Sequence, residues 1–74
     1  MITEGKVRKA YELMSKRWLY ADIVERLDLN LKQVEFIEKA RRRGIVAWKI
    51  TKVLEDIVEE TTFDEIEDIL NKIF

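Results

Sequence analysis

The chain has 74 residues, of which 47% are hydrophobic, with no proline, two glycines, no cysteine and no histidine. This length supports one domain without a deep catalytic pocket, and the missing residue types exclude disulfides, thiolate or imidazole zinc sites and His-based catalysis. No apolar run approaches the roughly 18 residues that span a bilayer, and the N-terminal segment lacks a signal-peptide core. We therefore expect a cytoplasmic, non-enzymatic protein with no cofactor, no metal and no membrane partner.

The net charge of −1 conceals a strong division along the chain. Residues 1–52 contain 13 basic and 7 acidic side chains, whereas residues 53–74 contain one basic and 8 acidic side chains. A basic body beside an acidic end is typical of nucleic-acid binding on one side. The alternative is that charge segregates by helix in a small, heavily charged protein.

The first predicted helix runs from about Thr3 to Trp18, and Thr3 is its expected N-cap because a hydroxyl there can accept from free amides of the first turn. Apolar residues recur at the spacing of one helical face. These are Val7, Ala10, Tyr11, Met14 and Trp18.

Two helices joined by a tight three-residue connection are predicted next, over residues 20–27 and 31–43. Asn30 and Gln33 have the spacing of a capping box at the start of the second one, and Gly44 suits its left-handed end. The inward positions of the second helix are Leu31, Val34, Ile37 and Ala40.

The stretch from Ile45 to Glu60 is ambiguous. Its apolar residues fit one helical face, but Val46, Trp48 and Ile50 also alternate as in a strand. A lone strand would leave its backbone groups unpaired, which favours a helix. A strand that pairs between two protomers is the alternative.

The last predicted helix covers residues 62–74, with a capping box formed by Thr62 and Glu65 and acidic residues in its first turns. Its apolar stripe either completes the core or, together with Trp48, forms a dimer or partner interface. The residues assigned to this interface are Trp48, Phe63, Ile66, Ile69, Leu70 and Ile73. A third possibility is that the acidic helix docks a basic protein partner.

The segment from Tyr20 to Arg43 resembles the helix-turn-helix of DNA-binding regulators, including the fourth region of bacterial sigma factors. Ile23, Val24 and Leu27 stand at the inward positions of its first helix, and Leu29 fills the apolar slot after the turn. Two positions depart from the family, which usually has alanine in place of Val24 and glycine in place of Asp28. Aspartate is one of the few residues that tolerate the left-handed conformation of that turn.

The resemblance implies an all-α bundle of four to five short helices in a single domain, with the helix over 31–43 as the recognition helix. It implies a sequence-specific transcriptional regulator that binds double-stranded DNA as a homodimer, of the kind that a virus, a plasmid or a compact prokaryotic genome encodes. The expected base contacts, as outward residues of that helix, are Asn30, Lys32, Gln33, Phe36 and Lys39. The expected phosphate contacts are Lys16, Arg17, Arg41, Arg42, Arg43, Lys49 and Lys52.

Two carboxylates, Glu35 and Glu38, stand against this assignment because they would repel phosphates near a groove. They favour the alternative function of a non-enzymatic helical protein–protein interaction module. An enzyme is not expected, because acidic pairs on helices are usually solvated and no glycine loop exists to cradle phosphates.

Overall fold

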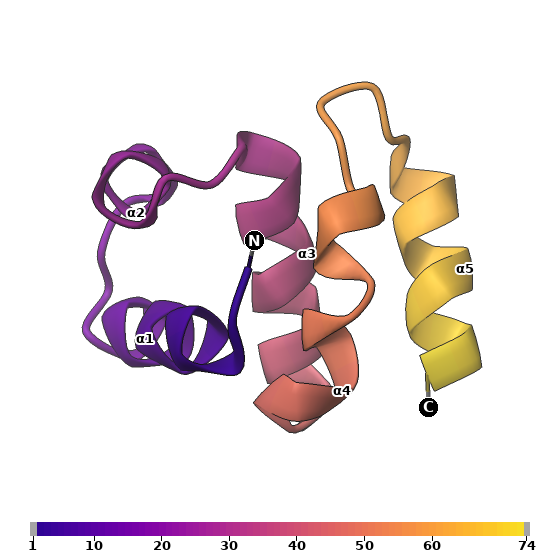
Figure 1. Cartoon of the computed structure of the whole chain (residues 1–74), viewed down its shortest axis with the longest axis horizontal. Helices are drawn as coiled ribbons and strands as arrows, with labels where there is room; N and C mark the ends of the chain where they lie inside the picture. Colours follow the sequence, from indigo (N-terminus) through magenta and orange to yellow (C-terminus); the bar gives the residue numbers. More distant parts are fainter. Residues whose placement is uncertain (1, 74) are drawn as a thin grey trace.

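The computed structural model describes residues 2–73, which form five α-helices and one 3₁₀-helix without any strand (Figure 1). The elements are α1 (Glu4–Ser15), α2 (Tyr20–Leu27), α3 (Leu31–Arg42), α4 (Ala47–Thr51), η1 (Leu54–Asp56) and α5 (Phe63–Ile73). The predicted all-α fold is confirmed. The expected end of the last helix at Phe74 lies outside the described residues. Within residues 2–73, no helix has the length and apolar character needed to cross a lipid bilayer.

The helix α1 begins as predicted but ends earlier. The Thr3 hydroxyl accepts a hydrogen bond from the Lys6 amide at 3.2 Å. After Ser15 the chain turns, because the Arg17 and Trp18 amides donate to carbonyls of the last helical turn. Trp18 therefore leaves the helix and is 40% exposed, so its predicted place on the buried face is wrong. Leu13 takes a buried position on α1 instead.

The turn between α2 and α3 has the predicted geometry. Asp28 closes α2 in the left-handed region, at φ 55° and ψ 52°. Both capping-box bonds form, from the Gln33 amide to Asn30 Oδ1 at 2.7 Å and from the Asn30 amide to Gln33 Oε1 at 2.9 Å. At the other end of α3, Gly44 has φ 73°, the left-handed conformation expected there. Local sequence therefore sets both ends of α3.

The segment after Gly44 is helical, as preferred over a strand, but it is not one continuous helix. The Thr51 hydroxyl donates back to the Ala47 carbonyl at 2.9 Å, a bond that often bends helices, and α4 ends there. The chain then makes the single turn η1 and an extended loop before α5. Bending at this point lets the buried side chains of Leu54 and Ile57 reach α3. The Leu54 and Ile57 carbonyls also accept hydrogen bonds from the side chains of Gln33 on α3 and of its N-cap, Asn30.

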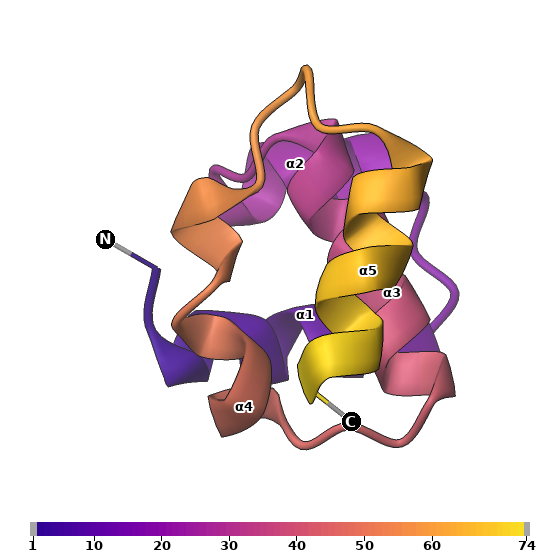
Figure 2. The ribbon, with the colours of Figure 1, turned by 90° about the vertical axis from the view of Figure 1, so that its right-hand side faces the viewer.

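The helix α5 folds back beside α3 and completes the core (Figure 2). The predicted capping box forms, since the Glu65 amide donates to Thr62 Oγ1 and the Thr62 amide donates to Glu65 Oε1, each at 3.1 Å. Ile66 and Leu70 of α5 are fully buried. The central residues of this apolar stripe therefore complete the core, which is one of the roles predicted for it.

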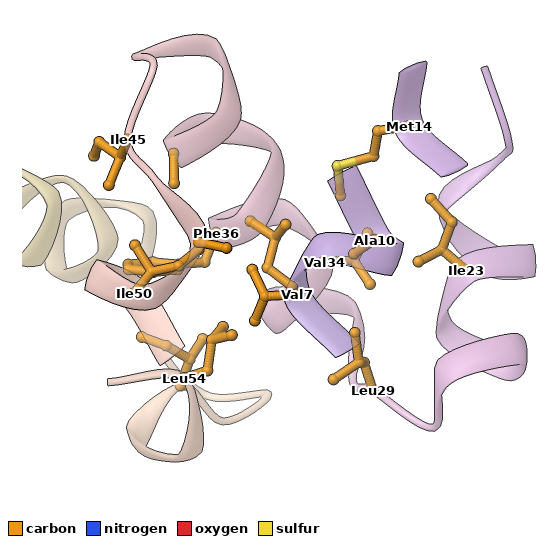
Figure 3. Packing of buried hydrophobic residues seen from close by; sticks show 14 of the residues in the cluster. Val7, Ala10, Met14, Ile23, Leu29, Val34, Phe36, Ile45, Ile50 and Leu54 are labelled. Carbon is orange, nitrogen blue, oxygen red and sulfur yellow. The ribbon is translucent and has the colours of Figure 1, made fainter. Parts of the chain in front are cut away.

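One continuous core joins all the helices (Figure 3). The helix α1 packs against α2, α3 and α4, so it lies at the centre of the helical contacts. The largest fully buried side chains come from every helix and from the loop after η1, and they include Val7, Ile23, Phe36, Ile50 and Ile57. Leu31, predicted to be buried, is 48% exposed, because the first turn of α3 turns Gln33 rather than Leu31 toward the chain around η1.

Candidate nucleic-acid interface

The predicted recognition helix, α3, lies in the middle of the fold rather than on its surface (Figures 1 and 2). Two of the expected base-contacting residues are buried: Phe36 has no exposed surface and Gln33 is 9% exposed. The Gln33 side chain also donates to the Leu54 carbonyl at 2.9 Å. The expectation that these two side chains face outward is wrong, because the chain after α4 returns across this side of α3.

The other three expected base contacts are held by intramolecular bonds. The Asn30 side chain caps α3 and donates to the Ile57 carbonyl at 3.0 Å. Lys32 lies 4.2 Å from the centre of the Phe63 ring, and Lys39 donates to Glu67 at 3.0 Å. A DNA groove can reach Lys32 and Lys39 in the predicted way only if α5 leaves α3, and it can reach Asn30 only if the loop after η1 also leaves.

Contacts of α5 with α3 are electrostatic as well as apolar. Arg43 pairs with Glu67, and its guanidinium also donates to Asn71 Oδ1 at 3.1 Å. Hydrogen bonding from Lys39, together with the charge of Arg43, lowers the pKa of the Glu67 carboxyl below its ordinary value of 4.5. Glu67 therefore stays ionised at neutral pH. It pairs with Lys39 of α3 and with Arg43, the C-terminal cap of that helix.

The two carboxylates on α3 that were expected to repel phosphates are paired with arginines or partly buried. Glu38 is 7% exposed; it accepts a hydrogen bond from Arg41 at 2.8 Å and forms an ion pair with Arg42 at 3.3 Å. Glu35 is half-buried, and its Oε2 atom has no hydrogen-bond partner among the described residues. Glu38 therefore presents no free charge to an approaching phosphate, and Glu35 presents a reduced surface.

Most of the predicted phosphate contacts remain on the surface. The chain from 39 to 54 contains six basic side chains and no acidic one, whereas the chain from 55 to 68 contains eight acidic side chains and no basic one. The Arg42 side chain is 74% exposed, and Lys49 and Lys52 are exposed on and just after α4. Lys16 and Arg17 are exposed at the far end of α1, where Lys16 pairs with Glu12 at 3.0 Å.

The structure adds two residues that the pattern of charges did not single out. Arg8 and Tyr11 of α1 line an open depression of about 420 Å³ together with Arg41, Val46 and Trp48. The Tyr11 hydroxyl donates to the Ile45 carbonyl at 2.7 Å, and burial raises its pKa although the nearby Arg41 charge opposes this. The sequence does not show that Arg8 lies near α4. Its position beside this depression follows from the packing of α1 against α4.

We call this region the basic end, defined as Arg8, Arg41, Arg42, Lys49 and Lys52 with the indole of Trp48. It lies where α4 meets the C-terminal end of α3 (Figure 1). Trp48 is 56% exposed, and Lys49 Nζ lies 5.8 Å from the centre of its ring. Arg8 pairs with Glu4 and Arg41 pairs with Glu38, whereas Lys49 and Lys52 have no acidic partner within residues 2–73. The basic end therefore carries a net positive charge.

The residues assigned to a dimer or partner interface fall into separate groups. Ile66 and Leu70 are in the core, and Ile69 and Ile73 are half-buried against it. Trp48 of α4 and Phe63 of α5 are more than half exposed. The expectation that Ile66 and Leu70 lie at an interface is wrong because both are buried in the core, and the other four residues stay a prediction.

Comparison with models of protein families, with curated protein sequences and with solved structures finds no match to this chain. Among residues 2–73, no three acidic side chains are grouped so that they could hold a metal ion.

Proposed function

We propose that this protein binds double-stranded DNA through phosphate contacts of its basic end. The single observation behind this proposal is the group of basic side chains near the exposed Trp48: Arg8 and Arg41 line one depression with it, and Lys49 Nζ lies 5.8 Å from the centre of its ring. Arg42 and Lys52 follow on the adjoining ends of α3 and α4. The Arg8–Glu4 pair is exposed and contributes only about 0–1 kcal/mol, so Arg8 can exchange its carboxylate for a phosphate at little cost. Glu38 is buried, so Arg41 and Arg42 would contact phosphates with the donors that Glu38 does not occupy.

The position of α3 bears on how such binding would work. Contacts to phosphates position a protein on DNA but carry no sequence information, whereas base edges must be read from a groove. With α5 docked, the side chains expected to read bases are buried or bonded elsewhere. We therefore propose binding that tolerates many sequences, and we keep transcriptional regulation as a prediction that depends on a sequence preference being measured.

The test is fluorescence anisotropy of a labelled random-sequence duplex between about 50 and 200 mM salt. Arg42→Ala/Lys49→Ala removes two charges from the basic end, and the matched control Lys6→Ala/Lys72→Ala removes two charges elsewhere. We expect the first variant to bind at least tenfold more weakly and to lower the salt slope by about 2, since each lost phosphate contact lowers it by about 1. The control should keep the slope of the unchanged protein.

Two results would overturn the proposal. One is the absence of duplex binding at 50 mM salt. The other is an equal loss of affinity in both double variants, because that would mean that only overall charge matters and that the basic end is not a site.

A second candidate function, binding of a basic protein partner, is favoured by the exposed carboxylates of α5 and the loop before it. Only Glu67 of the eight acidic residues in 55–68 pairs with a basic side chain within the described residues. A lysine-rich peptide is a suitable probe. We expect Asp64→Asn/Asp68→Asn to abolish its binding if this candidate is correct, and unchanged binding would reject it.

A further inference from the structure

The corner where α1 turns into α2 exposes more apolar surface than any neighbouring segment. Leu19 is 71% exposed, the highest value among the large hydrophobic residues, and Trp18 beside it is 40% exposed. Both line an open depression of about 520 Å³ whose other walls are Arg17, Asp22, Glu25 and Arg26. We call these six residues the α1–α2 corner. It lies at the opposite side of the molecule from α5 (Figure 1).

This corner is built at a local cost in stability. Arg17 has φ 65°, a left-handed conformation that costs a residue with a Cβ roughly 1–2 kcal/mol. Leu19 occupies the N-cap of α2, where no side-chain bond is made and where Ser, Thr, Asp or Asn would satisfy a free amide. Two positions on either side of Trp18 thus disfavour the isolated fold, at the point where Trp18 and Leu19 are exposed.

The charges around these apolar side chains are of both signs and are free to pair with another molecule. Within residues 2–73, none of Arg17, Asp22, Glu25 and Arg26 forms an ion pair. Asp22 and Arg26 are both exposed and stand one helical turn apart on α2, so they lie on the same face of that helix. Such a face complements itself when two copies meet in opposite directions.

We propose that the α1–α2 corner is the contact between two copies of this chain in a two-fold symmetric dimer. With the two α2 helices antiparallel across the axis, Arg26 of each copy faces Asp22 of the other, because a two-fold contact pairs residue i with j and j with i. The methylenes of Arg26 then cover Leu19 of the opposite copy. This surface is separate from the basic end, and the inference does not rest on DNA binding.

The expected dimer is weak, because α2 has only eight residues and the contact is therefore smaller than a standard interface. We expect a dissociation constant on the order of 10 µM or higher, since small interfaces of this kind support transient association. Sedimentation equilibrium of the unchanged chain without DNA, from about 5 to 500 µM, should show the mass rising from one copy to two.

Charge exchange provides the decisive test. Asp22→Arg places two arginines face to face, and Arg26→Asp places two aspartates face to face, so each variant alone should stay monomeric up to 500 µM. An equimolar mixture should dimerise again, because both cross-axis pairs are then of opposite charge. Glu59→Arg and Lys72→Asp are the matched controls, since they make the same changes of charge away from the corner and should dimerise like the unchanged protein.

The apolar part of the contact is tested with Leu19→Asp. This change supplies α2 with a capping carboxylate, so the monomer should unfold at an equal or higher temperature while the dimer is lost. Val58→Asp, at another exposed apolar position, should leave dimerisation intact. A chain that is monomeric at 500 µM would overturn the proposal. Charge variants that dimerise alone, or a mixture that stays monomeric, would overturn it as well.

Discussion

Replacement of Phe36 by alanine tests directly whether the outer face of α3 is covered. The side chain has no exposed surface in this structure, and truncation of a fully buried phenylalanine costs about 3–5 kcal/mol. A 74-residue domain has a total stability of about 4–11 kcal/mol, from roughly 0.05–0.15 kcal/mol per residue. Phe36→Ala should therefore remove about half of the free energy of unfolding.

The matched control is Phe63→Ala, which truncates a phenylalanine that is 54% exposed. Its ring contacts the Lys32 ammonium at 4.2 Å, a cation–π contact that contributes about 0.5–1 kcal/mol at an exposed site. Urea unfolding followed by far-UV circular dichroism gives both values. If Phe36→Ala does not fold at all, the milder Phe36→Leu should still fold and cost less than about 1.5 kcal/mol.

A loss of less than about 0.5 kcal/mol for Phe36→Ala would refute this reasoning, because such a value is typical of surface positions. It would mean that the chain after α4 does not cover α3 in solution. The side chains first expected to read DNA bases would then be accessible, and a recognition role for α3 would again be the preferred hypothesis.

Three further outcomes follow from the turns, the cap and the α3–α5 ion pairs. Arg17→Gly and Asp28→Gly should each raise the free energy of unfolding by about 0.5–1 kcal/mol in urea titrations, because both residues have a positive φ that glycine adopts without strain; destabilisation by either would contradict the observed turn. Asn30→Ala should lower the free energy of unfolding by about 1–3 kcal/mol in the same assay. It removes the cap of α3 and leaves the buried Ile57 carbonyl without a donor. A cost near zero would show that the bond to Ile57 does not form. The pKa of Glu67 is lowered in the folded protein, so its ion pairs stabilise the fold above pH 4.5, and this stability is lost as the pH falls through the folded pKa. Glu67→Gln should therefore flatten the decline of the urea midpoint at acidic pH. An unchanged decline would exclude Glu67 as its source.

The bounds of most helices could be predicted from local residues because the groups that begin and end a helix lie within a few positions of each other. Thr3, the Asn30–Gln33 pair and the Thr62–Glu65 pair all cap the helices that they were expected to cap. Gly44 and Asp28 adopt the left-handed conformations that their positions require. The five-helix fold follows from these signals together with the apolar spacing.

The continuous helix expected over 45–60 is the main local error, and its cause is only partly local. The apolar spacing is helical throughout, but the chain bends after Thr51, whose hydroxyl bonds back to Ala47. The bent segment is then held by Gln33 of α3 and by its N-cap Asn30, which donate to the carbonyls of Leu54 and Ile57. Those donors are more than 20 residues away along the chain. A pattern within one segment carries no information about them.

The sequence by itself therefore determined the helices, their caps, the left-handed turns and the division into a basic and an acidic part. Only the tertiary structure decided which face of α3 is covered. Phe36 is apolar and Gln33 is polar, and each fits either an outward reading position or a buried one, since amphipathic spacing defines a helical face but not what packs on it. The return of η1 and α5 across α3 covered that face, whereas the basic end and the α1–α2 corner line open depressions.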